Sequence, residues 1–143
     1  MTNIFVQKMD PSAKLPSYSY EGDAGMDLFS FEDVNLEAGG KALIATGIKV
    51  AIPKGYAGFV WDKSGIAVKH HIKTMAGVID SNYRGELKIA LTNLGKSAYQ
   101  IKKGEKIAQL IVKPVASVDI TEVQNIETDT ERGEGGFGSS GML

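Results

Sequence analysis

Apolar and polar residues alternate with a period of two along much of the chain, which is the pattern of β-strands that bury one face. Alternating stretches occupy residues 48–52, 87–91 and 118–121, and a compact apolar run broken by one glutamine occupies residues 107–112. Turn signals that contain glycine recur along the chain, at Gly39-Gly40, Gly55, Gly85, Gly95 and Gly104. Short strands and turns at this spacing predict an all-β sandwich or barrel.

One segment departs from this pattern and predicts a single helix. Residues 64–70 begin with Ser64, a good N-cap residue, and end in basic residues, which suit the negative end of a helix dipole. We expect at most about two helical turns here, with His70 as the helix end and His71 as its cap. Two adjacent histidines are too few to form a metal site by themselves.

Composition narrows the possible functions. A chain of 143 residues, 43% of them hydrophobic, predicts one globular domain. A net charge of −1 argues against binding to a nucleic-acid backbone. Because the chain has no apolar run of about 18 residues and no signal-peptide start, we expect no membrane contact and a cytoplasmic location. It has no cysteine, which excludes a disulfide, a thiolate nucleophile and a cysteine-bound metal.

The C-terminal residues 132–141 combine five glycines with two serines, one arginine and one phenylalanine. Glycine-rich backbone and hydroxyl groups bind anions, arginine grips phosphate through two bonds, and an aromatic ring stacks on a base. This composition predicts a lid that orders over a nucleotide with several phosphates, and it also fits a disordered Gly/Ser tail. We expect a β domain at residues 1–126 and a flexible linker and lid at residues 127–143.

The strongest chemical candidate inside the domain is Asp80, which follows apolar residues and precedes a turn. A carboxylate held at a strand end suits a general base that must orient a water molecule. The alternative is an aspartate that stabilises the turn by bonding to the backbone two residues later. Tyr83, three residues on, fits either core packing or a wall against a sugar ring.

Three weaker candidates accompany Asp80. Lys63, Ser64 and Gly65 lie at the start of the predicted helix, where free N–H groups bind phosphate, and Ser64 also fits an ordinary helix cap. Gln109 is the glutamine in the apolar run, and a buried amide must be hydrogen-bonded, so it either bridges strands or faces a site. Asp27 places one carboxylate between small and apolar residues.

Five segments in one order carry a family resemblance: residues 24–30, 62–72, 76–86, 104–112 and 132–141. Together they closely resemble the homotrimeric dUTP diphosphatases, the dUTPases, and the third and fifth segments are the most specific. The resemblance implies a jelly-roll-like β barrel with one short helix, three chains per molecule and active sites at subunit junctions. It also implies hydrolysis of dUTP to dUMP and pyrophosphate with Mg²⁺ on the triphosphate, which limits uracil in DNA and supplies dUMP.

The same resemblance implies roles for single residues. Asp80 would deprotonate the attacking water, Gln109 would help to position the water or the phosphates, and Asp27 would reach the metal region through water. Tyr83 would pack on deoxyribose and exclude a 2′-hydroxyl, and Phe137 would stack on the base. The implied substrate contacts are Lys63, Ser64, Gly65, Thr74, Gly77, Val78, Ile79, Tyr83, Lys88, Arg132, Phe137, Gly138, Ser139 and Ser140.

Three positions depart from the usual family pattern, and two alternatives stay open. Lys63 stands where many members have arginine, Thr74 where many have asparagine, and Asn82 where aspartate is common. At position 63 the lysine offers the phosphate a point charge in place of the two hydrogen bonds of an arginine. Deoxycytidine triphosphate deaminases share the fold, although the context of Asp80 favours a hydrolase. A dUTPase-like trimer can also act as a nucleotide-controlled regulator that binds a protein partner.

Overall fold

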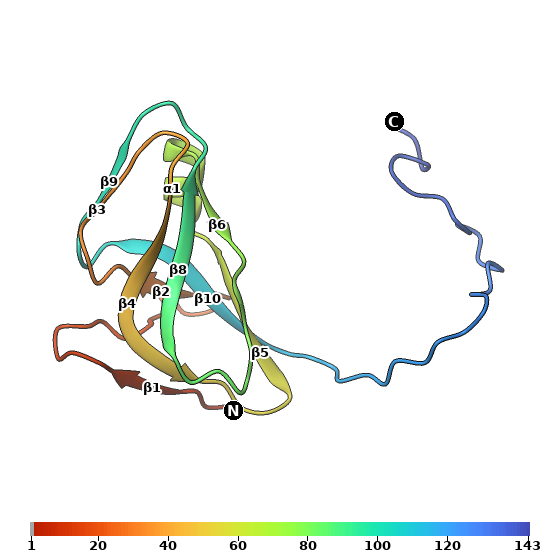
Figure 1. The fold of residues 1–143 in the computed structure, drawn as a ribbon, viewed down its shortest axis with the longest axis horizontal. Helices are drawn as coiled ribbons and strands as arrows, with labels where there is room; N and C mark the ends of the chain where they lie inside the picture. The colour runs from red at the N-terminus through yellow and green to blue at the C-terminus, as the bar shows by residue number, and fades with distance from the viewer. Residues whose placement is uncertain (1) are drawn as a thin grey trace.

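A computed structural model describes residues 2–143 and confirms a mostly β fold with one short helix (Figure 1). Its elements, in chain order, are β1 (Phe5–Lys8), β2 (Met26–Phe29), β3 (Val34–Leu36), β4 (Lys41–Ala51), β5 (Tyr56–Asp62), α1 (Ser64–His70), β6 (Ile72–Met75), β7 (Val78–Ile79), β8 (Glu86–Asn93), β9 (Tyr99–Ile101) and β10 (Lys106–Pro114). The predicted strands at residues 48–52, 87–91 and 107–112 fall within or at the end of β4, β8 and β10.

Two four-stranded antiparallel sheets face each other and enclose the core, as expected for a jelly-roll-like barrel. Their strand orders are β1-β4-β8-β6 and β2-β10-β5-β7, and β3 pairs with β9 in a smaller ribbon. Alternate residues of β8, Leu87, Ile89 and Leu91, are buried, and they join Leu28 of β2 and Leu110 of β10 in one apolar cluster. The period of two in the sequence therefore reflects strands with one buried face.

The helix lies where the sequence predicts it, but its cap differs. Lys63, in an extended conformation, is the N-cap, and Ser64 is the first helical residue, so the prediction of a serine cap is wrong. The Lys63 carbonyl already accepts the first helical bond, from the Ala67 amide at 3.0 Å. His70 is the last helical residue and His71 is its C-cap, as predicted, and His71 takes the left-handed conformation. No helix within residues 2–143 is long and apolar enough to cross a membrane.

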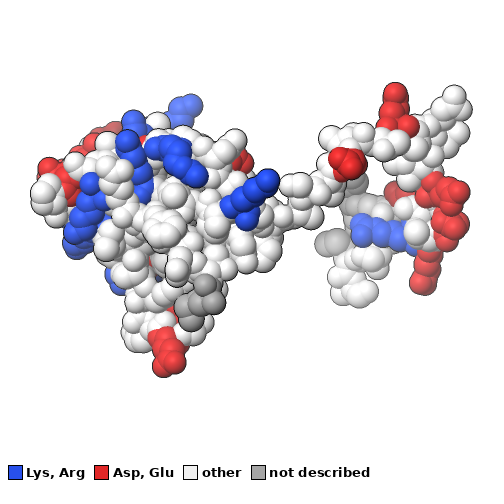
Figure 2. Space-filling view, turned by 90° about the horizontal axis from the view of Figure 1, so that it is seen from below, with Lys and Arg blue, Asp and Glu red and all other residues white. Residues whose placement is uncertain are grey.

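Beyond β10 the chain leaves the barrel and runs away from it (Figure 1). Residues 115–143 contain no helix or strand, so the strand predicted from the alternation at residues 118–121 is wrong. Val118 and Ile120 are exposed here, because the segment has no neighbouring strand to supply hydrogen bonds. This tail is acidic, with six carboxylates against one arginine, in contrast to the lysines spread over the barrel (Figure 2). The boundary at residues 126 and 127 stays a prediction.

Candidate active site

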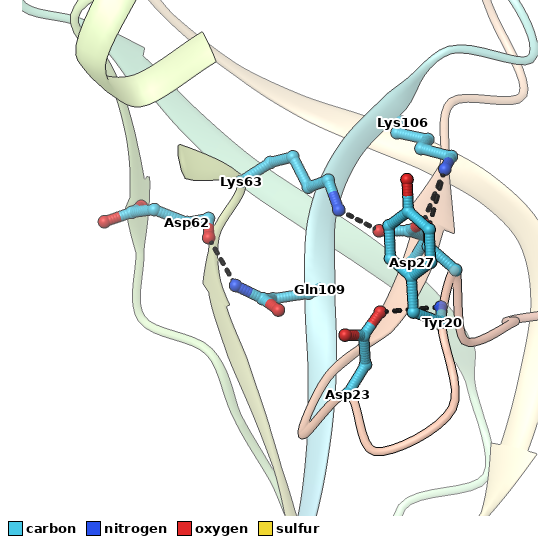
Figure 3. Close-up of polar contacts among 8 residues, drawn as sticks. Tyr20, Asp23, Asp27, Asp62, Lys63, Lys106 and Gln109 are labelled. Carbon is cyan, nitrogen blue, oxygen red and sulfur yellow. Dashed lines mark hydrogen bonds and ion pairs between the residues drawn. The ribbon is translucent and has the colours of Figure 1, made fainter. Parts of the chain in front are cut away.

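One cavity of about 730 Å³ gathers two lysines between the loop before β2, the start of α1 and β10. We call it the lysine pocket, and its lining residues are Ser17, Tyr18, Ser19, Tyr20, Asp23, Ala24, Gly25, Lys63, Ser64, Lys106 and Gln109. Lys63 joins β5 to α1, and Lys106 and Gln109 belong to β10. Figure 3 shows Lys63 and Lys106 reaching Asp27, while the Gln109 amide points toward Asp62.

Asp27 lies beneath this pocket as the shared partner of both lysines. Its side chain is 2% exposed, the Lys63 ammonium binds Oδ1, and Lys106 Nζ lies 2.8 Å from Oδ2 (Figure 3). Ser19 Oγ donates to Oδ2 at 2.6 Å. Burial opposes ionisation, but the hydrogen bonds from Lys106, Lys63 and Ser19 outweigh it and lower the pKa of Asp27 to about 2. The carboxylate is therefore charged at neutral pH.

Gln109 both bridges two strands and lines the lysine pocket, so the two possibilities left open by its sequence are combined. Its Nε2 donates to the Asp62 carbonyl of β5 at 2.8 Å (Figure 3). Its Oε1 lies against Gly25, where a Cβ would come within 2.2 Å of that oxygen. Gly25 thus provides the space in which the amide is held.

A second cavity, of about 290 Å³, contains Asp80 and Tyr83. We call it the tyrosine pocket, and it is lined by Leu43, Val78, Ile79, Asp80, Tyr83, Glu86, Leu87 and Lys88. Asp80 follows β7 directly, and its carbonyl accepts the Tyr83 amide at 3.1 Å. Its carboxylate makes no hydrogen bond within residues 2–143, which argues against the turn-stabilising role. The Tyr83 hydroxyl donates to the Glu86 carbonyl at 2.8 Å, which fixes the ring.

Thr74 is engaged inside the barrel and lines neither pocket. Its amide and hydroxyl both donate to Asp62 Oδ1 at 2.7 Å, and Lys73 Nζ lies 2.8 Å from Oδ2. Partial burial opposes ionisation of Asp62, but these bonds from Lys73 and Thr74 lower its pKa. Gly77 is also used internally, because its carbonyl accepts the Val60 amide at 2.8 Å. Asp62 therefore links β6 to the end of β5.

A single chain does not bring all the candidate residues together. The lysine pocket and the tyrosine pocket share no lining residue. The tail runs away from the barrel (Figure 1), and neither Arg132 nor Phe137 lines either pocket. Arg132 Nε donates to the Gly135 carbonyl at 2.7 Å. A site on the barrel that also uses Arg132 or Phe137 therefore needs a large movement of the tail, or the tail of another chain.

The family is decided by comparison with known proteins. The sequence profile of the dUTPase family matches residues 11–141. The chain belongs to the dUTPase family. A deoxyuridine 5'-triphosphate nucleotidohydrolase of Clostridium kluyveri is 48% identical over 142 residues, which cover 98% of this chain and 99% of that protein. These matches favour the hydrolase over the deaminase alternative.

Solved dUTPase structures extend the likeness to the fold. A mutant dUTPase of Staphylococcus bacteriophage 80alpha with dUpNHpp is 33% identical, with a TM-score of 0.93 over 99% of this chain and 100% of that one. A mutant dUTPase of phage phi11 of S. aureus, described with a coordinated structural Mg(II) ion, is 31% identical, with a TM-score of 0.82 over 88% of this chain and 99% of that one.

The geometry of the chain restricts how it can hold a metal. Residues 2–143 contain no group of three or more histidine, cysteine or acidic side chains that could hold a cation. Both oxygens of Asp27 are occupied by lysines, and the side chain is almost fully buried. These residues do not fit direct coordination, so a divalent cation would take its ligands mainly from the substrate phosphates.

Sequence reasoning missed Lys106 and Ser19, the two partners of Asp27 that complete the lysine pocket of this dUTPase. Lys106 is 79 positions away from Asp27 in the chain, and the two meet because β10 pairs with β2 in an antiparallel register that places Gln109 opposite Asp27. The only local signal for Lys106 was its position directly before the apolar run 107–112.

Proposed function

We propose that this protein hydrolyses dUTP to dUMP and pyrophosphate. The observation that carries the proposal is a chain of the dUTPase family in which an unpaired carboxylate, Asp80, and a fixed tyrosine ring, Tyr83, share a small pocket, while two lysines line another. The first pocket suits a nucleoside and a water molecule, and the second suits phosphates.

The residues divide the work by their chemistry. Asp80 accepts a proton from the water that attacks the α-phosphate, and Gln109 helps to position the water or the phosphates. Lys63, Ser64 and Gly65 hold the inner phosphates, and Tyr83 packs on deoxyribose. Mg²⁺ bound to the triphosphate supplies charge neutralisation.

The base and the outer phosphates are assigned to the remaining candidates. Val78, Ile79 and Lys88 face the nucleoside, and they line the tyrosine pocket. The tail closes over the bound triphosphate, with Phe137 on the uracil ring; its phosphate contacts come from Arg132, Gly138, Ser139 and Ser140. Thr74 and Gly77 act through the backbone they hold in place, because both are bonded inside the barrel.

The decisive assay compares pyrophosphate release from dUTP, dTTP, dCTP and UTP, with Mg²⁺ and with excess EDTA. We expect dUTP alone to turn over rapidly, and only when Mg²⁺ is present, because the triphosphate carries about four negative charges that two lysines do not neutralise. Ammonia release from dCTP would instead indicate a deaminase. Failure of dUTP to react under either condition would overturn the proposal.

We expect a homotrimer in which each site takes the lysine pocket from one chain and the tyrosine pocket from another. The exposed apolar residues Leu43 and Val78 at the tyrosine pocket, 62% and 63% exposed, fit burial against a neighbour. Asp80→Asn and Lys63→Gln/Gln109→Ala chains should each be nearly inactive. Reassembled as a mixture, they should regain roughly a quarter of wild-type activity, since random pairing restores that share of composite sites.

Sedimentation velocity and activity of the mixture test this arrangement together. Sedimentation must show trimers for the parents and for the mixture. Mixed trimers without recovered activity, or a fully active monomer at low concentration, would exclude a site shared between chains.

Tyr83→Ala should narrow discrimination between dUTP and UTP, because the fixed ring leaves no room for a 2′-hydroxyl. We expect the ratio of kcat/KM for dUTP over UTP to fall at least tenfold, from both a weaker dUTP fit and a better UTP fit. Tyr99→Ala is the matched control, because this tyrosine of β9 lines no cavity with Asp80 or Lys63. An unchanged ratio in Tyr83→Ala would remove this residue as the sugar selector.

A further inference from the structure

Lys63 and Lys106 are equivalent in their surroundings. Both line the lysine pocket, both bind the carboxylate of Asp27, and their side chains are 29% and 46% exposed. They approach Asp27 from two sides (Figure 3), and both line the pocket that an anion would occupy. Lys106 Nζ further lies 2.9 Å from Ser19 Oγ, which helps to hold its position.

The charges around the pocket balance before any ligand binds. Two ammonium groups face Asp27 below them, and a second carboxylate, Asp23, lines the pocket, where it accepts the Tyr20 amide at 2.9 Å (Figure 3). A buried carboxylate must be paired, and here one carboxylate holds the ammonium groups of both lysines at the same pocket. The pocket is thus organised for an anion but has little net positive charge to offer it.

We propose that Lys106 is a second phosphate-binding lysine of this pocket, and that Asp27 is the buried counterion that holds Lys63 and Lys106 in place before the triphosphate arrives. This rests on the proposed hydrolysis of dUTP. When the triphosphate binds, the two ammonium groups turn from the carboxylate toward the phosphates. The negative charge of Asp27 then repels the phosphates and lowers the affinity for the triphosphate. The cation carried by the substrate then offsets that charge, so Asp27 acts through the lysines and makes no contact with the metal.

This role and a water-mediated metal contact of Asp27 predict opposite results when metal is removed. If Asp27 is a counterion, its neutralisation strengthens metal-free binding of a triphosphate, because two lysines are released. If Asp27 acts through the metal, its neutralisation changes nothing in EDTA and removes only the gain that Mg²⁺ provides.

The first measurement is calorimetric binding of dUpNHpp and of dUMP to full-length chains, in excess EDTA and in Mg²⁺. Lys106→Gln should raise the Kd of dUpNHpp in EDTA about tenfold, which is the usual effect of one charge-assisted hydrogen bond. The Kd of dUMP should change by less than about twofold. Lys102→Gln is the control, because it removes the same charge four positions earlier and outside the pocket. Equal Kd values for Lys106→Gln and Lys102→Gln would overturn the inference.

The second measurement uses Asp27→Asn. We expect its Kd for dUpNHpp in EDTA to fall about fivefold, the effect of removing one nearby like charge from a partly exposed site. An unchanged or raised Kd in EDTA contradicts the counterion role. Thermal melting confirms that the variant folds; if it does not, Lys106→Gln, at an exposed side chain, decides the question alone. Wild-type protein that binds no dUpNHpp would overturn the proposed function itself, a result distinct from either variant outcome.

Discussion

Asp80→Asn is expected to lower kcat for dUTP by at least a hundredfold while nucleotide binding changes little. The amide keeps the size and shape of the side chain but cannot accept the proton of the attacking water, and loss of a general base usually costs 10²- to 10⁴-fold. Since the carboxylate of Asp80 is exposed and makes no hydrogen bond within residues 2–143, the substitution should leave the melting temperature unchanged. Single-turnover kinetics and calorimetric binding of dUpNHpp separate the two effects.

Asp119→Asn is the matched control, because it removes the same charge from the tail, outside both pockets. It should behave as wild type in both measurements. A variant Asp80→Asn that keeps more than about a tenth of the wild-type kcat would exclude this carboxylate as the essential base. Loss of binding in parallel with kcat would instead assign Asp80 to holding the sugar.

Local patterns in the sequence predict the strands of the barrel well, but they do not show where an alternating segment fails to form a strand. The alternation at Leu87, Ile89 and Leu91 becomes a strand with one buried face because β4 and β6 pair with it on both sides. The same alternation at Val118 and Ile120 does not form a strand. A period of two indicates which face of a strand could be buried, but it does not indicate whether a partner strand is present. Alternation alone is therefore not sufficient for a strand.

The candidate site shows the same division between local and distant information. The position of Asp80 at a strand end is a local property, and the sequence predicts it. The pairing of Asp27 with Lys63 and Lys106 depends on β2, β5 and β10 meeting in one sheet, which no short motif encodes. Likewise, the hydrogen bonds that Thr74 gives to Asp62 appear only when β6 lies beside the end of β5.

Removing residues 133–143 should leave a folded trimer whose kcat for dUTP is at least tenfold lower. Residues 133–143 contain no helix or strand and line neither pocket, so their loss costs the barrel little stability. Figure 1 shows this end of the chain away from the barrel. Its glycines make ordering costly in entropy, so it closes only when outer phosphates and base supply contacts together. Closure completes the phosphate grip and excludes water from the reaction.

The acidic character of the tail sharpens this expectation. With six carboxylates in residues 115–143, the segment is repelled by a bare triphosphate, so its approach must depend on Arg132, on Phe137 and on a cation already bound. Phe137→Ala in the full-length chain should therefore weaken the binding of dUpNHpp by about 1–3 kcal/mol, the value of one stacked base. Met142→Ala, at another exposed apolar residue of the tail, should leave this binding unchanged.

For the truncation, steady-state kinetics on the shortened chain, with thermal melting to confirm its fold, is the deciding measurement. A well-folded truncation with unchanged kcat/KM would show that the tail is an ordinary disordered end and that the barrel alone performs the reaction.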